Sequence, residues 1–395
     1  MDGYVVAVAI LLFFFIHLWR QNRNNPLPNW PIIGMSVGFF CNLSNIYDFL
    51  TKVLKYHGGT FMIQGPWFTN IKFVITSDPT NVQHITGKNF SNYGKEDILH
   101  SLFKNNTFES FHHQIIQKKL ETSLIPFLSH ASKEGTQVEL QDIFQRFTFD
   151  NICSMVLGFD PNCLPNNFNE LSETHYSKIL CKLQKWFRIG HEKDLSESQV
   201  IVDQLLHECI ASRCENQSKY NSNQADESNF DVLKALMGET GNEQIDHKFL
   251  RDTALNLLFA GRDTISASLS WFFWLVSTHP LVEAKILEQI RDTFVTKQES
   301  WVNIGVDELK KLVYLHGAIC ETLRLFPPVP MEHKCAIKSD ILPSGYIIYP
   351  NTMVLYSLYA MGRNEETWGK DCLEFKPERW ISEKGAIYTY HLTSS

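Results

Sequence analysis

The sequence lacks the patterns that mark several classes of protein. No long run of Lys and Arg occurs in its 395 residues, and 36 basic residues against 43 acidic ones leave a net charge of −7. Nucleic-acid binding, which depends on a basic patch, therefore has no support. The nine cysteines are odd in number, and their spacing fits neither a disulfide framework nor a zinc motif. We expect reduced thiols in a protein body that faces the cytosol.

Two further gaps concern single residue types. No Trp occurs between Trp67 and Trp186, and no Arg occurs between Arg23 and Arg146. The last cysteine is Cys372. The absence of both Trp and Arg from residues 68–145 excludes a site there that is built on these two residue types. The absence of Cys after Cys372 excludes a cysteine ligand within residues 373–395.

The composition is that of a globular protein, with 44% hydrophobic and 20% charged residues. The 28 Phe residues favour an aromatic-rich interior or an apolar pocket. Hydrophobic spacing predicts a mainly α body with small β-sheets. Helices are expected at 46–56 and 141–156 and after Asp78-Pro79, strands at 60–63, 71–75, 346–349 and 352–355, and an exposed loop at 221–228.

The amino terminus predicts a single transmembrane helix. Residues 3–19 are apolar except for His17, and 17 residues span roughly 25 Å as a helix, close to a bilayer of about 27 Å. Asp2 precedes this run, and Arg20 and Arg23 follow it, so the body is expected on the cytosolic side. A cleaved signal peptide is the alternative, but it requires a preceding positive charge and a small-residue cleavage site.

A proline-rich segment separates the predicted anchor at 3–19 from the rest of the chain. Pro26, Pro28 and Pro31 fall within six residues, where they fix φ and prevent a helix. We therefore expect a stiff, extended hinge over residues 20–34 and a folded domain over 35–395.

A long helix is predicted over 246–279, where no proline interrupts the apolar pattern. Its 34 residues would extend about 50 Å. Gly261 lies in its middle and costs about 1 kcal/mol relative to Ala, so a ligand approach or a local bulge is expected there. Asp263 and Thr264 follow directly. The ordinary alternative is a solvated Asp263 and a Thr264 that bonds back to its own helix.

Glu321 and Arg324 are three residues apart and share one face of a second predicted helix, which ends at Pro327-Pro328. On a surface such a pair is worth only about 0.3–0.5 kcal/mol. Buried and bidentate, it would fix how neighbouring segments pack. Both interpretations are open from spacing alone.

Three motifs in order resemble those of the cytochrome P-450 monooxygenases: AGRDT at 260–264, ETLR at 321–324 and PERW at 377–380. The resemblance implies the P-450 fold and a haem cofactor. It implies that Gly261 lies against the haem, that Asp263 relays protons and that Thr264 hydrogen-bonds the bound oxygen. It also implies a structural network that joins Glu321 and Arg324 to Arg379.

The same resemblance implies further roles and partners. His333, in VPMEHK, would hold a haem propionate. LQDIFQRFTFDNIC, ETLRLFPPVP and EFKPERW are similar to a plant microsomal subgroup that hydroxylates long aliphatic chains, fatty acids or alkanes. The expected partners are an NADPH-dependent cytochrome reductase, an apolar long-chain substrate and the endoplasmic reticulum membrane.

The chain departs from the family pattern in two places. The family's iron-ligating Cys follows PERW, and residues 381–395 contain none, so no metal ligand is assigned. A family WxxxR helix is also missing, and the join near Leu99–His100 indicates an internal deletion. We therefore expect an incomplete P-450 fold. The alternatives for this chain are a catalytically dead remnant or pseudogene product, favoured for the chain as written, and a haemless lipid-binding module.

Overall fold

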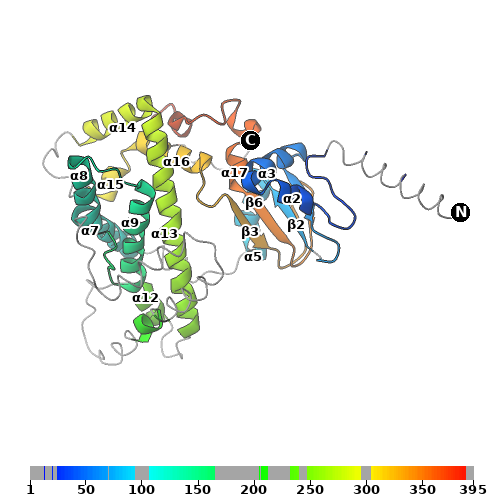
Figure 1. The fold of residues 1–395 in the computed structure, drawn as a ribbon, viewed down its shortest axis with the longest axis horizontal. Coiled ribbons are helices and arrows are strands. Elements are labelled where there is room, and N and C mark those ends of the chain that lie inside the picture. Colours follow the sequence, from blue (N-terminus) through cyan, green and yellow to red (C-terminus); the bar gives the residue numbers. More distant parts are fainter. Residues whose placement is uncertain are drawn as a thin grey trace, which may run out of the picture. The chain divides into compact units, whose positions relative to one another are not determined.

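A computed structural model describes residues 25–69, 71–93, 106–164, 206–211, 232–239, 247–294 and 304–387, together with residues 13, 20 and 204. The chain divides into two compact units (Figure 1). Unit 1 comprises Met1–Glu96 and Leu312–Ser395, and unit 2 comprises Asp97–Lys311. Unit 1 is thus assembled from both ends of the chain, and unit 2 is inserted between its halves.

The predicted anchor at 3–19 lies outside the described residues apart from Phe13. The predicted loop at 221–228 and the join at Leu99–His100 lie outside them too. Within the described part of the chain, no helix has both the length and the apolar character needed to cross a bilayer.

Unit 1 is organised around a four-stranded sheet with the order β1-β2-β6-β3. The strands are β1 (Thr60–Gln64), β2 (Lys72–Thr76), β3 (Met331–Cys335) and β6 (Met353–Ser357). β2 pairs with β6 in parallel, with Phe73 opposite Met353, and the other pairs are antiparallel. A second sheet joins β4 (Asp340–Ile341) to β5 (Ile347–Ile348). Because β2 and β6 lie far apart in sequence, this pairing unites the two halves of the unit.

The helices of unit 1 follow from local signals. In α3, the residues Leu50, Val53 and Leu54 recur at helical spacing and are buried. Asp78 caps α4, where its carboxylate accepts a hydrogen bond from the Thr80 N–H at 2.8 Å. The helices are α2 (Ser36–Cys41), η1 (Leu43–Asn45), α3 (Ile46–Tyr56), α4 (Pro79–Gln83), the π-helix η2 (His84–Lys88), α5 (Phe90–Tyr93), α16 (Val313–Leu325), α17 (Leu358–Gly362), α18 (Glu365–Trp368) and η7 (Pro377–Trp380).

Unit 2 is helical throughout its described part. Within this unit the helices α9 and α13 lie side by side (Figure 1). Its core lies between α9, α12 and α13 and includes Val156, Leu236 and Ala254. The described helices are α7 (Asn106–Lys119), the π-helix η3 (Leu120–Leu124), α8 (Ile125–Lys133), α9 (Leu140–Leu157), α12 (Val232–Glu239), α13 (His247–Thr278), α14 (Pro280–Thr293) and α15 (Val306–Leu309).

Candidate functional site

Gly261 lies where α13 contacts α9. A Cβ atom at this position would stand 2.5 Å from the Cδ1 atom of Ile152. The missing side chain therefore lets the two helices approach closely. The expected bulge does not occur, since α13 continues as an α-helix from His247 to Thr278. The space beside Gly261 is filled by Ile152, and the haem-contact role of Gly261 stays a prediction.

Asp263 and Thr264 lie on the same helix, two and three residues after Gly261. The Thr264 hydroxyl donates to the Ala260 carbonyl oxygen at 2.6 Å, which satisfies it within the helix. The Asp263 side chain is 47% exposed, with its Oδ1 atom 3.7 Å from Nε of Arg262. The Arg262 side chain is buried, with its guanidinium 5.9 Å from the ring centroid of Phe149. The acid is thus held at the surface of unit 2 while its neighbour points into the core.

One face of α13 carries this pair. Residues at intervals of three or four share this face of the helix: Ala260, Thr264, Ala267 and Trp271. Ala260 is exposed and Trp271 is 39% exposed, whereas Ala254 and Leu250 on another face are buried. The alcohol of Thr264 therefore shares a face with the small side chains of Ala260 and Ala267.

Glu321 and Arg324 form a buried, bidentate ion pair in α16. Nε and Nη2 of Arg324 each donate to one carboxylate oxygen of Glu321 at 2.7 Å. The Glu321 side chain is fully buried, and that of Arg324 is 2% exposed. Arg324 also donates through Nη1 to the carbonyl oxygens of Gly362 and Cys372, the latter at 2.6 Å. The guanidinium therefore holds α16, α17 and the segment before η7 together.

Arg379 joins the same carboxylate. Its Nε atom lies 3.3 Å from Oε1 of Glu321, and its Nη2 atom lies 2.8 Å from Oδ1 of Asp371. The Trp380 indole N–H donates to Oε2 of Glu321 at 2.9 Å. These contacts hold the pKa of Asp371 down at about 2, chiefly through hydrogen bonds from Lys376 and Arg379. The structure thus brings together the three residues that the sequence analysis grouped in a network.

His333 is separate from these residues. It lies in β3, opposite Leu355 of β6, and its side chain is exposed. It therefore presents its imidazole to the surface of unit 1, and its predicted contact with a propionate stays a prediction.

A polar cluster around Asp340 in unit 1 was not foreseen from the sequence. The Oδ2 atom of Asp340 accepts hydrogen bonds from Asn89 at 3.0 Å and from Tyr93 at 2.8 Å, and it lies 2.8 Å from Nε2 of His84. Burial alone would raise the pKa of Asp340, but these hydrogen bonds outweigh it and hold the pKa below its ordinary value. The partners are about 250 residues apart in sequence, so no local pattern signals them.

A second unforeseen cluster lies in unit 2. Nζ of Lys119 lies 2.9 Å from carboxylate oxygens of both Asp150 and Asp160, and Asp150 also accepts from the Cys163 N–H at 2.8 Å. Burial raises the pKa of Asp150, and the charge of Lys119 opposes that rise. Lys119 of α7 contacts Asp150 of α9 and Asp160 after α9, so the cluster joins these three segments.

Four of the described cysteines lie in the core of unit 2 or beside the network around Glu321. Cys153, Cys163 and Cys209 pack in the core of unit 2. Cys372 is buried in unit 1, where its carbonyl oxygen accepts from Arg324. Its backbone is therefore committed to the network around Glu321. No group of His, Cys, Asp and Glu among the described residues could hold a metal ion by itself.

A helical body with a small sheet, a long helix that carries an acid and an alcohol, and a buried Glu–Arg–Arg network define the class of haem-dependent monooxygenases. Comparisons with known proteins agree. The family model "Cytochrome P450" matches residues 103–393. The fold resembles the crystal structure of a cytochrome P450, CYP102L1, with a TM-score of 0.66 and 19% identity, over 86% of this chain and 82% of that one.

Two plant proteins are similar over nearly the whole chain. Alkane hydroxylase MAH1 of Arabidopsis thaliana is 34% identical over 428 aligned positions, covering 97% of this chain and 84% of that protein. Cytochrome P450 86B1 of the same plant is 35% identical over 428 positions, covering 96% of this chain and 76% of that protein. The chain belongs to the cytochrome P450 family. It is by family a haem-containing monooxygenase, an oxidoreductase.

Proposed function

We propose that this protein hydroxylates long aliphatic chains, a fatty acid or an alkane, with electrons delivered by an NADPH-dependent reductase. The observation that carries the proposal is the open face of α13, where Asp263 and Thr264 stand beside small side chains. Similarity to an alkane hydroxylase over 97% of the chain supports the choice of substrate. An abundance of Phe also suits an apolar substrate.

The residues of this face have distinct tasks in the proposal. Bound haem supplies the oxidising power that inserts one oxygen atom into a C–H bond. The Asp263 carboxylate, nearly half exposed, exchanges protons with solvent and passes them inward. The Thr264 hydroxyl, which donates to Ala260, would serve as a hydrogen-bond donor on the side of the helix that faces the haem. His333 would hold a haem propionate, and the network around Glu321 keeps unit 1 in shape.

The test uses the full chain together with a plant reductase, NADPH and a series of long-chain fatty acids and alkanes. We expect hydroxylated product that depends on both NADPH and the reductase. Asp263→Asn should lower the turnover rate by about 10²-fold, because a positioned proton donor is lost. Asp252→Asn is the matched control: Asp252 lies on the same helix, with a side chain 44% exposed. Equal losses in the two variants would contradict the role of Asp263.

A catalytically dead chain is the alternative, and one observation favours it. Both plant relatives align over 428 positions, whereas this chain has 395 residues, so each relative carries at least 33 residues that face gaps in this chain. In this alternative the lost segment contains the family's WxxxR helix, near Leu99–His100. No hydroxylated product would then be formed with any substrate of the series.

The proposal places the protein in the endoplasmic reticulum membrane as a single-pass protein. Support comes from the apolar run at 3–19, followed by Arg20 and Arg23. The domain over residues 35–395 then lies on the cytosolic side, where a reductase can reach it. Carbonate extraction of microsomes followed by protease treatment tests this placement, and release of the chain by carbonate would refute it.

A further inference from the structure

The helix α9 holds α13 at three neighbouring points around Arg262. Ile152 packs at Gly261, where an added Cβ atom would stand 2.5 Å from its Cδ1 atom. The Thr148 hydroxyl donates to the Arg262 carbonyl oxygen at 2.9 Å. The Phe149 ring centroid lies 5.9 Å from the Arg262 guanidinium. The backbone and the side chain of Arg262 are therefore both held by α9.

The bond from Thr148 to Arg262 is shielded from water, since Thr148 is 3% exposed and Arg262 is 2% exposed. The hydroxyl also lies 2.8 Å from the Phe144 carbonyl oxygen of its own helix, an ordinary back-bond for Thr. Its one proton is thus shared between a local carbonyl and a carbonyl of another helix. Because water cannot replace a donor at a buried place, loss of the hydroxyl would be felt at the Arg262 carbonyl.

Arg262 lies in a stretch of α13 whose carbonyl oxygens accept hydrogen bonds from hydroxyl groups. The Thr264 hydroxyl donates to the Ala260 carbonyl oxygen at 2.6 Å, and the Ser266 hydroxyl donates to that of Asp263 at 3.2 Å. Such back-bonds compete with the N–H donors of the helix and allow it to bend. These two hydroxyls belong to α13 itself, whereas the Arg262 carbonyl receives its hydroxyl from α9. The contact from α9 therefore fixes a stretch of helix that is otherwise easily deformed.

Arg262 in turn faces the carboxylate of Asp263, with its Nε atom 3.7 Å from Oδ1. The Arg262 carbonyl and the Asp263 N–H belong to one planar peptide unit, so a donor that fixes this carbonyl also fixes the backbone at Asp263. The Asp263 side chain is 47% exposed, and an exposed side chain keeps one position only where neighbouring groups hold it. The place of this carboxylate therefore depends on Arg262, and the place of Arg262 depends on α9.

We propose that Thr148 is a positioning residue for proton transfer by Asp263. Its hydroxyl fixes the peptide unit between Arg262 and Asp263, so that the carboxylate keeps its place beside Nε of Arg262. Thr148 acts through Arg262 and not on the reacting groups themselves. This inference rests on the proposed function, which gives Asp263 its task, and it adds a residue of a second helix on which that task depends.

Two substitutions separate the hydroxyl of Thr148 from its shape: Thr148→Val removes the hydroxyl and keeps the branched shape, and Thr148→Ser keeps the hydroxyl. The full chain is treated with a water-soluble carbodiimide and glycine ethyl ester, and labelling at Asp263 is divided by labelling at Asp252. Asp252 is a matched reference, because it is 44% exposed on the same helix and pairs with Arg251. Thr148→Val should raise this labelling ratio about fivefold, the effect of one lost hydrogen bond. Thr148→Ser should keep the ratio of the unchanged chain.

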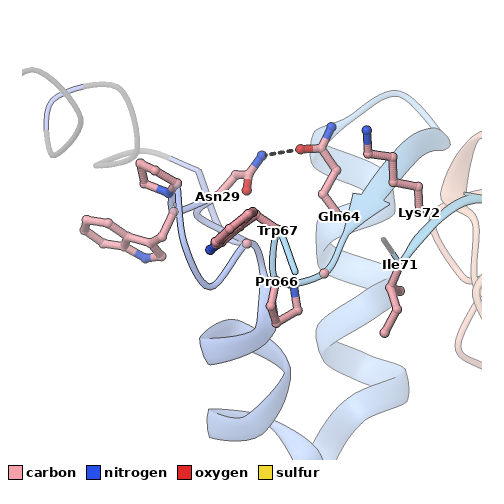
Figure 2. Close-up of a pocket in the computed structure, with 10 residues that line it drawn as sticks. Asn29, Gln64, Pro66, Trp67, Ile71 and Lys72 are labelled. Carbon is pink, nitrogen blue, oxygen red and sulfur yellow. Dashed lines mark hydrogen bonds between the residues drawn. The ribbon is translucent and has the colours of Figure 1, made fainter. Parts of the chain in front are cut away.

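Two control variants remove hydrogen bonds elsewhere. Ser154→Ala removes a hydroxyl of α9 that donates to the Asp150 carbonyl oxygen of the same helix at 2.8 Å. Asn29→Ala removes a bond in unit 1, where Nδ2 of Asn29 donates to Oε1 of Gln64 at 2.9 Å beside a pocket of about 340 Å³ (Figure 2). That bond has the same length as the bond from α9 to α13. Neither control should change the labelling ratio.

Urea unfolding of the same variants measures stability separately from the position of Asp263. If Thr148→Val lowers the free energy of unfolding but leaves the labelling ratio unchanged, Thr148 serves packing alone and the inference is wrong. An equal rise of the ratio in Thr148→Val and Thr148→Ser also overturns it, because the hydroxyl would then not be the group that matters.

Turnover separates this inference from the proposed function. With reductase, NADPH and a long-chain substrate, Thr148→Val should lower kcat about fivefold at an unchanged KM, and Thr148→Ser should restore kcat. If no chain forms product but the labelling ratio rises in Thr148→Val, the proposed function fails and the positioning of Asp263 by Thr148 stands. If the unchanged chain forms product and Thr148→Val alters neither kcat nor the ratio, the proposed function stands and this inference fails.

Discussion

Replacement of Glu321 by Gln should unfold unit 1 locally. The carboxylate is fully buried and accepts four hydrogen bonds: two from Arg324 at 2.7 Å, one from the Lys376 backbone at 3.0 Å and one from Trp380 at 2.9 Å. The Arg379 guanidinium adds an ion-pair contact at 3.3 Å. An amide has the same shape, but it places an NH₂ group against these donors and leaves buried guanidinium charge uncompensated. Breaking a buried pair in this way costs about 3–5 kcal/mol. That loss is a large part of a domain's stability of about 5–15 kcal/mol.

Hydrogen exchange is the appropriate assay, because a chain of two units need not unfold in one step. In Glu321→Gln, protection of α16 peptides should fall by about 10²- to 10⁴-fold, the equivalent of about 3–5 kcal/mol. Peptides from α9 in unit 2 should keep their protection. Glu383→Gln, a change at an exposed glutamate of unit 1, should alter neither. A fall of less than tenfold in α16 would refute the assignment of a strong structural role to this carboxylate.

Two further predictions concern packing and pH. Gly261→Ala should lower the free energy of unfolding of unit 2 in urea by about 1–2 kcal/mol, because the new Cβ meets Cδ1 of Ile152. Ile152→Val in the same chain removes that Cδ1 atom and should restore part of the lost stability. Additive losses would show that the two side chains do not compete for one space. The pKa of Asp340 is lower in the folded chain than its ordinary value of 3.8, so as the pH falls the unfolded chain takes up this proton before the folded chain does. Asp340 therefore stabilises unit 1 at a pH above 3.8, and this stability is lost as the pH falls through the lowered pKa of the folded state. Unfolding free energy measured from about pH 5 to about pH 3 should therefore fall less steeply for Asp340→Asn than for the unchanged chain, and identical slopes would contradict the hydrogen-bond account.

Where a local pattern predicted a helix or strand among the described residues, the structure has that element at nearly the same position. The helix expected at 46–56 is α3, Ile46–Tyr56, and the helix expected at 141–156 is α9, Leu140–Leu157. The long helix expected over 246–279 extends over His247–Thr278. The strands were displaced by no more than two residues. Periodicity, proline and capping residues act within a few positions, which is why these predictions succeed.

Contacts between distant segments could not be predicted in this way. Nothing near Gly261 in the sequence indicates that Ile152 packs against it. The sequence analysis therefore explained the glycine by a ligand or a bulge, whereas in the structure it allows the close packing of α9. The partners of Asp340 and of Lys119 were likewise missed, because each cluster draws on separate elements. The Glu321 network was expected only through resemblance to a family, since spacing alone allowed a surface pair. Its burial and bidentate geometry are visible only in the structure.

The parallel pairing of β2 with β6 has a consequence for synthesis of the chain. Thr76 ends one strand and Met353 begins the other, with 276 residues between them. At about 5–20 residues per second, a ribosome needs about 14–55 s to make the intervening segment. During that interval β1 and β2 form a hairpin with an open edge, while the inserted unit 2 can already begin to fold. We therefore expect the nascent chain to engage chaperones at β2 until β6 emerges, which makes late translation the step most exposed to aggregation.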